Sequence, residues 1–287
     1  MAGADLLSGE IVFSPDDPDA AGHFNRMLRE FYRQNRRPMP WRVNLSPYRV
    51  LVSEMMLQQT QVSRVTQKFP GFIAVFPDFQ TLGVASLEDI LRSWQGLGYN
   101  RRAKYLQAIA RTVTDKWNGE LPDDPAVLET LPGIGKATAG SIVTFTWNYP
   151  LVFIETNVRR VFLYHFFPGK DPVPDREIYP VIERMLDRSN PREWYYAVMD
   201  YGAFLSGRVS NPNRRSSHYA VQSPFGGSDR QVRGGIIRML LSHGPMPRED
   251  LVRRCGTDET RSGDILSRMI NEGILKDNSS IISFVEV

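Results

Sequence analysis

The 287-residue chain contains a single cysteine, Cys255. One thiol cannot close an intramolecular disulfide, and it cannot supply the four thiolates of a structural zinc or iron–sulfur site. We therefore expect a protein without a bound metal or other cofactor. Long apolar runs are also missing, since none approaches the ~20 residues that span a bilayer. Residues 1–18 are acidic and lack the pattern of a signal peptide, so we expect no membrane partner and an intracellular location, in the cytoplasm or nucleoid.

Excess positive charge is small as well, because 35 Lys and Arg residues face 32 Asp and Glu residues, which gives a net charge of +3. That excess is too weak to indicate a nucleic-acid partner by itself. The basic residues nevertheless gather in short stretches, within 29–42, 101–104, 208–215 and 230–233. Basic clusters near turns favour a polyanionic partner, with an ordinary solvated surface as the alternative.

Apolar residues recur at helical spacing between residues 21 and 205, where no convincing strand appears. Residues 1–20 are polar and rich in Asp and Pro, and we expect them to be disordered or loosely packed. Residues 206–227 are rich in Ser, Asn, Arg and Gly and predict a basic linker or loop. Residues 228–287 predict three helices and a hairpin with Asp277-Asn278 at its turn, a winged-helix-like α/β domain. A role in DNA groove reading, in protein docking or in structure alone stays open for that domain.

The turn Leu-Pro-Gly-Ile-Gly-Lys at 131–136 lies between two expected helices, 124–130 and 137–146. Pro132 and Gly133 end the first helix, and the glycines let backbone N–H groups approach a ligand closely. The second helix begins with unpaired N–H groups and a positive dipole end, beside the charge of Lys136. The turn therefore predicts a helix-hairpin-helix that grips a DNA phosphate, with an ordinary helical corner as the alternative.

Two glutamates flank this turn in the sequence. Glu54 lies in an apolar helical stretch, and burial would raise the pKa of its carboxyl and make it a general acid. The alternatives are a solvent-facing Glu or one paired with Arg49 or Arg42. Glu155 follows an apolar run where the next helix starts, a position that favours an ionised carboxylate. An ordinary first-turn acid is the alternative there.

Polar and aromatic side chains at two further turns could contact bases. Gln58 and Gln59 end the helix of Glu54, and amides read base edges or fill the gap left by a displaced base; a polar helix end is the alternative. Tyr99 follows Gly96-Leu97-Gly98 and precedes a basic stretch. An aromatic ring there could wedge into a base stack while cations hold phosphates, or it could simply staple a helix.

Together these motifs resemble the helix-hairpin-helix DNA glycosylase superfamily that includes endonuclease III, and most closely its adenine DNA glycosylases of the MutY type. The resemblance spans residues 24–205 and rests on segments 40–42, 53–62, 96–99, 131–135, 157–161 and 199–203, in the family's order. It implies a mainly α, two-lobed helical fold. Residues 21–38 and 150–205 would form a lobe of terminal helices, and residues 39–149 a six-helix barrel that contains the hairpin. Linker 206–227 and the winged-helix-like domain 228–287 would follow.

The resemblance also implies roles for individual residues. Glu54 would protonate the leaving base, and Glu155 would stabilise the sugar cation. The base pocket would be lined by Trp41, Arg42, Leu57, Gln59 and Asp200. DNA would be contacted by Gln58, Gln59, Tyr99, Arg101, Gly133, Gly135, Lys136, Ala137, Arg214 and Arg215.

The chain departs from the family pattern at three places. Glu155 stands where the family has Asp, and ~1 Å of misplacement can cost about a hundredfold in rate. Ala137 stands where the bifunctional lyases have Lys, so no amine is present for a Schiff base. The four cluster cysteines are replaced by Ser206, Asn213, Ser216 and Gln222. The family's C-terminal domain for 8-oxoguanine is not apparent either, which leaves that preference open.

The sequence thus predicts a monomeric, monofunctional DNA glycosylase with weak or no lyase activity. It would act on double-stranded DNA with a mismatch or lesion, flip the affected base, adenine first of all, and hydrolyse its N-glycosidic bond. A thymine or uracil mismatch glycosylase on the same fold is one alternative. A lesion-binding protein that the change from Asp to Glu has impaired in catalysis is the other.

Overall fold

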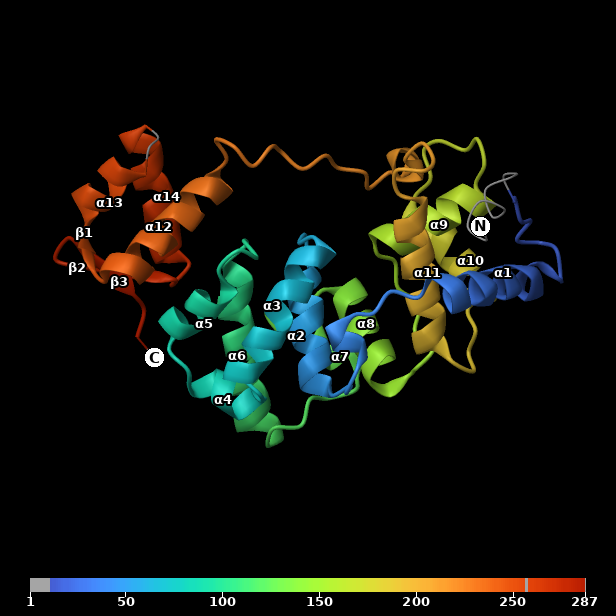
Figure 1. The fold of residues 1–287 in the computed structure, drawn as a ribbon, viewed down its shortest axis with the longest axis horizontal. Helices are drawn as coiled ribbons and strands as arrows, with labels where there is room; N and C mark the ends of the chain where they lie inside the picture. Colours follow the sequence, from blue (N-terminus) through green and yellow to red (C-terminus); the bar gives the residue numbers. More distant parts are fainter. Residues whose placement is uncertain (1–10, 256–257, 287) are drawn as a thin grey trace. The chain divides into compact units, whose positions relative to one another are not determined.

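Helices dominate the computed structural model, which describes residues 11–255 and 258–286 (Figure 1). Tertiary contacts divide the chain into two compact units. The first contains the described residues up to Pro38, Asp123–Ala126 and Gly135–Val221, and the second contains Met39–Pro122, Val127–Ile134 and residues from Gln222 onward. The short helix α7 (Pro125–Leu128) crosses the division. The expected mainly α fold is confirmed.

The first unit is built from helices α1 (Ala20–Asn35), α8 (Lys136–Trp147), α9 (Thr156–Phe166), α10 (Asp175–Met185) and α11 (Pro191–Leu205), with the 3-10 turn η3 (Pro212–Arg215). Helix α11 packs against both α1 and α9. Aromatic rings fill the space between them, as where Phe24 meets Phe162 and Trp194 edge-on. Buried aromatic side chains of this size supply much of a core's apolar area.

Phe13 joins that core from outside the helices. Its backbone N–H donates to the His165 carbonyl at 2.9 Å, and its ring stacks on Phe166. The expectation of a loose N-terminus is therefore wrong for this residue, because one aromatic anchor outweighs the polar composition around it. Residues 1–10 of that expectation lie outside the described residues.

The second unit begins with the turn η2 (Pro40–Arg42) and continues through α2 (Pro47–Leu57), α3 (Val62–Val75), α4 (Phe79–Val84), α5 (Leu87–Trp94) and α6 (Arg101–Trp117). Side-chain caps start several of these helices. Ser46 Oγ accepts from the Arg49 N–H, and Ser86 Oγ accepts from the Asp89 N–H. Such caps satisfy backbone donors that a helix start otherwise leaves unpaired.

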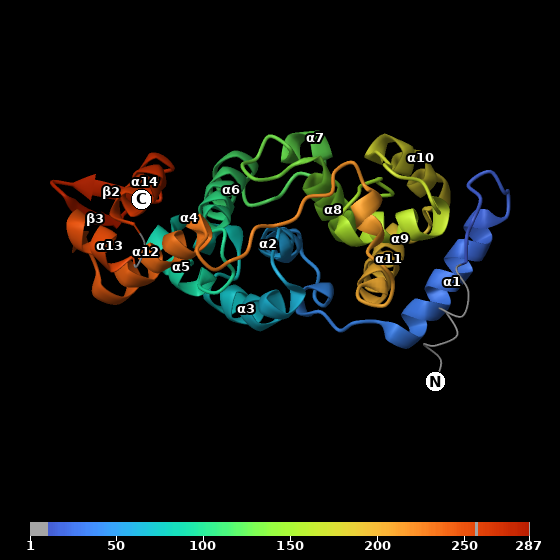
Figure 2. The ribbon, with the colours of Figure 1, turned by 90° about the horizontal axis from the view of Figure 1, so that it is seen from above.

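The C-terminal domain belongs to the same unit and contains α12 (Asp229–His243), α13 (Arg248–Arg254) and α14 (Glu259–Asn271). Its antiparallel sheet has the order β1 (Met246–Pro247), β3 (Ile281–Phe284), β2 (Leu275–Asn278). Helix α12 packs against α5 of the barrel (Figure 2). The winged-helix-like domain is confirmed, but its hairpin turns at Ser279-Ser280 instead of Asp277-Asn278. Both serines have positive φ, at 53° and 67°, as a tight two-residue hairpin requires.

The division into units differs from the expected boundaries, because Asp123–Ala126 and Gly135–Val221 group with the terminal helices and the C-terminal domain groups with the barrel. Helix α8 groups with the terminal helices, because Gly140 lets it approach Phe153 closely; a Cβ at Gly140 would lie 3.1 Å from that side chain. Residues 222–227 group with the C-terminal domain instead of the linker. Among the described helices, none is long and apolar enough to cross a membrane.

Candidate functional site

Glu54 lies on the last full turn of α2, half-buried between the buried side chains of Ser53 and Met55. Trp41, expected in the base pocket, is buried at 7% exposure and packs edge-on against Phe69. The Trp41 indole therefore packs η2 against α3. Arg42 and Leu57 are half-buried.

Two strained turns follow α2 and α5. Gln59 and Tyr99 are non-glycine residues with φ of 52° and 47°, in the left-handed region. A large side chain in that region is uncommon and costs about 1 kcal/mol or more, and such strain clusters at functional sites. The surrounding structure must therefore hold both turns in place.

Arg102, at the start of α6, holds them. Its side chain is buried and donates to six oxygens of the two turns: the carbonyls of Met55, Met56, Gln58, Leu97 and Gly98, and Thr60 Oγ1, at 2.5–3.1 Å. Burial lowers the pKa of Arg102 to about 10, which leaves it charged at neutral pH. Sequence reasoning grouped Arg102 with a basic stretch and missed this role, because the acceptors lie up to 47 residues away.

The hairpin at 131–136 has the geometry that its glycines predict. Gly133 has φ of 79°, and a Cβ there would lie 2.6 Å from the Tyr105 ring. The Gly133 carbonyl accepts from Gln58 Nε2 at 3.0 Å, which ties the hairpin to the end of α2. Gly135 is the N-cap residue of α8 and has no side chain with which to cap it, and the start of a helix carries the positive end of its dipole. Lys136 is exposed and Ala137 half-buried.

Glu155 is the N-cap residue of α9. Its Oε1 accepts from the Asn157 N–H at 2.8 Å and from the Val158 N–H at 2.9 Å. Desolvation raises the pKa of the carboxyl, while those two N–H groups and the nearby Arg160 oppose the rise. The other oxygen, Oε2, accepts a long hydrogen bond of 3.4 Å from Asn157 Nδ2. One oxygen is thus anchored and the other is much less constrained.

Helix α11 fixes the start of α9 from the other side. Gly202 lies so close that a Cβ there would meet the Asn157 carbonyl oxygen at 2.5 Å. Arg160 donates to Asn157 Oδ1 at 2.7 Å and to the Gly202 carbonyl at 2.8 Å. The loop that carries Glu155 is therefore clamped between backbone and side-chain contacts.

Asp200, expected in the base pocket, is fully buried and paired with Arg37. The Arg37 Nε donates to Oδ1 at 2.7 Å, and the Arg37 backbone N–H donates to Oδ2 at 3.1 Å. This ion pair fastens the end of α1 to α11, so we do not place Asp200 in the base pocket. Sequence reasoning missed Arg37 as its partner because 163 residues separate the two.

Hydrogen bonds stabilise the loop that contains Asn213 and Ser216, two of the positions at which the family has cysteines. Asn213 is buried and its Nδ2 donates to the Thr156 carbonyl at 3.1 Å, directly after Glu155. Arg215, expected to contact DNA, donates to the carbonyls of Leu163 and Phe167 at the end of α9. Its guanidinium is thus committed to the loop, and we assign it no phosphate. Arg214 is exposed.

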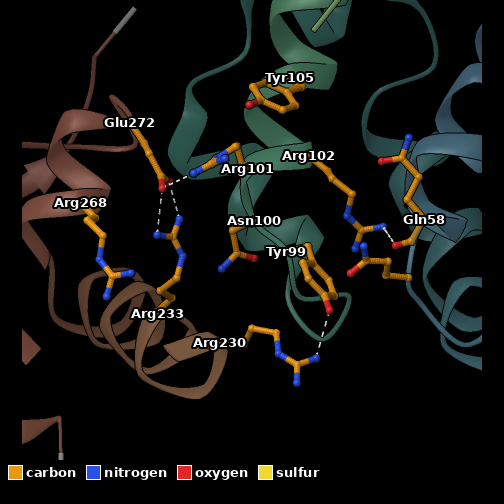
Figure 3. A pocket seen from close by; sticks show the side chains of 11 residues that line it. Gln58, Tyr99, Asn100, Arg101, Arg102, Tyr105, Arg230, Arg233, Arg268 and Glu272 are labelled. Carbon is orange, nitrogen blue, oxygen red and sulfur yellow. Dashed lines mark hydrogen bonds and ion pairs between the residues drawn. The ribbon is translucent and has the colours of Figure 1, made fainter. Parts of the chain in front are cut away.

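Arg101, the remaining expected DNA contact, pairs with Glu272 at the end of α14 (Figure 3). In the described part of the chain, no group of three or more His, Cys, Asp or Glu side chains could hold a metal ion. The second unit thus presents Glu54, the turn at Gly133 and two turns that carry amides and an aromatic ring, and the first unit presents Glu155 at the start of α9.

Comparison with known proteins gives one answer at the level of the family. Residues 52–184 match the HhH-GPD superfamily of base excision DNA repair proteins. The chain is similar to the adenine DNA glycosylase of Mycobacterium tuberculosis, with 30% identity over 275 residues, 86% of this chain and 88% of that protein. The chain is also 34% identical over 186 residues to the adenine DNA glycosylase of Buchnera aphidicola. This match covers 63% of the present chain and 53% of the Buchnera protein, so the chain spans about half of that relative's length.

Among solved structures, a thermostable thymine-DNA glycosylase superposes with a TM-score of 0.59 at 20% identity, over 68% of this chain and 91% of that one. This likeness shows a shared fold. The family resemblance that the motifs indicate is confirmed.

Proposed function

This chain belongs to the HhH-GPD superfamily of base excision DNA repair proteins, and we propose that it is a monofunctional DNA glycosylase that removes adenine from mispaired or damaged duplex DNA. The observation that carries the proposal is the 30% identity to an adenine DNA glycosylase along 88% of that protein's length. The local structure supports it, because the hairpin, the two strained turns and Glu155 are each built as rigid elements.

The reaction breaks the bond between the deoxyribose C1′ and a base nitrogen, and the bonding electrons leave with the base. Glu54 donates a proton to the departing base, which then leaves as a neutral molecule. Water adds its oxygen to C1′ and gives up a proton to a carboxylate. The products are the free base and an abasic site, as in other glycoside hydrolyses.

Glu155 stabilises the positive charge that develops on the sugar. Its Oε1 is fixed by two backbone N–H groups, so the carboxylate needs no reorganisation when the charge appears. The less constrained Oε2 is the atom that we assign to the sugar. The backbone at Glu155 is extended, with φ of −116° and ψ of 177°, which is the ordinary conformation of an N-cap residue.

Ala137 supports the monofunctional assignment. An amine at this position would form a Schiff base with the abasic sugar and lead to strand cleavage. A methyl group cannot do so, and the abasic product is released intact. We further propose that the protein acts as a monomer on the cell's own DNA.

A panel of labelled duplexes tests the proposal. Each duplex carries one candidate pair: A opposite G, A opposite 8-oxoguanine, T or U opposite G, or hypoxanthine. After incubation, half of each sample is treated with alkali, which opens abasic sites. We expect alkali-dependent cleavage at adenine and no enzyme-made nick. Cleavage at T or U alone would make the protein a mismatch pyrimidine glycosylase, and tight binding without product on every duplex would make it a lesion binder.

A further inference from the structure

The peptide group between Thr156 and Asn157 connects the Glu155 carboxylate to the buried side chain of Asn213. At one edge of this group, the Asn157 N–H donates to Glu155 Oε1 at 2.8 Å. At the opposite edge, the Thr156 carbonyl accepts from Asn213 Nδ2 at 3.1 Å. The carbonyl and the N–H belong to one planar unit, so a bond that fixes the first also orients the second. All four residues lie in the first unit.

Asn213 is itself held in place for this contact. Its side chain is buried in η3, which packs against α9. Its backbone N–H donates to Asn211 Oδ1 at 3.2 Å, and its carbonyl accepts from the Ser216 N–H at 3.0 Å. A carbonyl oxygen can only accept, so the amide must present its nitrogen to Thr156. Among the described residues, Asn213 Oδ1 has no hydrogen-bond partner. The side chain therefore serves the Thr156 carbonyl alone.

Both peptide groups that bind Glu155 Oε1 are supported from behind. Asn213 supports the first. The second donates through the Val158 N–H at 2.9 Å, and its carbonyl, that of Asn157, lies against Gly202 of α11, where a Cβ would approach within 2.5 Å. A peptide that accepts a hydrogen bond at its carbonyl becomes a stronger donor at its N–H, by ~10–30% per bond. Asn213 thus strengthens as well as orients the Asn157 donor.

We propose that Asn213 is a positioning residue for Glu155, which fixes and polarises the Thr156–Asn157 peptide and so holds the carboxylate for the sugar cation. The inference rests on the proposed function in one respect, that Glu155 is the carboxylate that stabilises this cation. Asn213 stands where the family has a cluster cysteine. A thiolate has no N–H to donate, so the role belongs to the residue that replaces the cysteine.

Loss of the Asn213 amide should change how Glu155 titrates. Burial raises the pKa of the Glu155 carboxyl, and the N–H groups of Asn157 and Val158 oppose that rise. A weaker Asn157 donor opposes it less, so the pKa should rise further when Asn213 is replaced. Stabilisation of the sugar cation requires the ionised carboxylate. The excision rate should therefore begin to fall at a higher pH as the solution is made more acidic.

Other charged or titratable side chains on α9 and the elements packed against it stay unchanged in this experiment. They are Arg159, Arg160 and His165 on α9, Asp175 on α10, Tyr201 on α11, Arg215 on η3 and His218 after it. Arg159 pairs with Asp175 at 2.7 Å, and Arg160 donates to the Gly202 carbonyl at 2.8 Å. A shift of the acid limb therefore reports on the Asn213 contact.

The test compares Asn213→Leu and Asn213→Asp with the control Asn211→Ala. Leucine branches at the same atom as asparagine but cannot donate, and an ionised aspartate has the shape without the donor. Asn211 is exposed and caps the same turn, so its loss loosens η3 without removing the bond to Thr156. Single-turnover excision of adenine opposite G, with full-length enzyme in excess, is followed across the pH range in which each protein stays folded. DNA affinity and melting temperature are measured in parallel.

We expect both Asn213 variants to lose about tenfold in the plateau rate, because even ~1 Å of misplacement of a catalytic group is costly. Their acid limb should move up by about half a pH unit, the order expected for a weakened hydrogen bond to a charged group. DNA affinity should not change, and Asn211→Ala should keep the wild-type rate and limb. An unshifted limb in both Asn213 variants, with or without a loss of rate, or an equal shift in Asn211→Ala, would overturn the inference.

A second measurement needs no excision. The amide proton of Asn157 is followed by NMR during a pH titration of the free protein, and its chemical shift responds as Glu155 ionises. We expect a higher midpoint in Asn213→Leu than in wild type. A wild type that excises nothing, but whose Asn157 midpoint depends on Asn213, refutes only the glycosylase. A wild type that excises adenine, with the same midpoint in both proteins, refutes only the positioning role.

Discussion

Replacement of Glu155 by Gln separates the chemistry of this carboxylate from its structural role. The carboxylate Oε1 accepts the N–H groups of Asn157 and Val158 at 2.8 and 2.9 Å. A glutamine Oε1 can accept the same two bonds, so the cap of α9 survives the change. What disappears is the negative charge, together with the cost of burying it, which is what raises the pKa of Glu155.

These effects predict a small change in stability and a large change in rate. Loss of a cap altogether costs ~1 kcal/mol, in a range of about 0.5–2. Since Gln retains the cap, we expect the free energy of unfolding to change by less than about 1 kcal/mol, a shift in melting temperature of roughly 2–4 °C at most. Removal of a preorganised group that stabilises transition-state charge costs about 2.7–4 kcal/mol, or ~10²–10³ in rate.

The assay is single-turnover excision of adenine with enzyme in excess, accompanied by a thermal melt and a duplex-binding curve for Glu155→Gln. We expect a rate at least a hundredfold below wild type with unchanged DNA affinity. Glu155→Ala serves as the comparison, because it removes both charge and cap and should also unfold more readily. A Glu155→Gln rate within threefold of wild type would refute the assigned role of this carboxylate.

Three further predictions concern the framework around the site. The fully buried His165 has its pKa lowered to about 4 by desolvation, against about 6.5 when unfolded. As the pH falls, the unfolded chain therefore binds a proton at His165 before the folded protein does. About 3 kcal/mol of the free energy of unfolding, fully present above pH 6.5, should be lost as the pH falls to 4. Urea titrations of wild type and His165→Gln test this, and the same pH dependence of the unfolding free energy in both proteins would contradict it. Gly202→Ala should destabilise the folded protein by ~1–3 kcal/mol, because the new Cβ would lie 2.5 Å from the Asn157 carbonyl oxygen. Gly22→Ala, at an open helical position, is the control and should stabilise the folded protein by ~0.5–1 kcal/mol in the same urea titrations. Gly133→Ala, at φ of 79° and against Tyr105, should weaken duplex binding in an anisotropy titration, and wild-type affinity would count against the hairpin as a phosphate contact.

Local features of the fold were predictable from the sequence. The turn at Gly133 was predicted correctly, because Pro and Gly end helices, and its φ of 79° is one that glycine adopts without strain. The helix of Glu54 and the three helices of the C-terminal domain follow apolar periodicity. The hairpin turn was misplaced by two residues, since Asp277-Asn278 and Ser279-Ser280 are both acceptable turn chemistry and the register depends on packing of the strands.

Long-range partners were not predictable. Arg102, Arg37 and Arg215 all appear in basic stretches, and composition alone treats them as surface charge. In the structure each guanidinium is committed to oxygens distant in the chain, on α2, α11 and α9. The tertiary fold determines the positions of the carbonyl and carboxylate acceptors, and therefore which arginine side chains could contact DNA.

The central claim is that this protein hydrolyses the N-glycosidic bond of adenine. Its most direct test is mass-spectrometric detection of the free base after incubation of wild-type protein with a duplex that carries one adenine opposite G or 8-oxoguanine. We expect one equivalent of adenine per abasic site, with both strands uncut until alkali is added. Intact duplex with no released base, on DNA that the protein demonstrably binds, would contradict the claim.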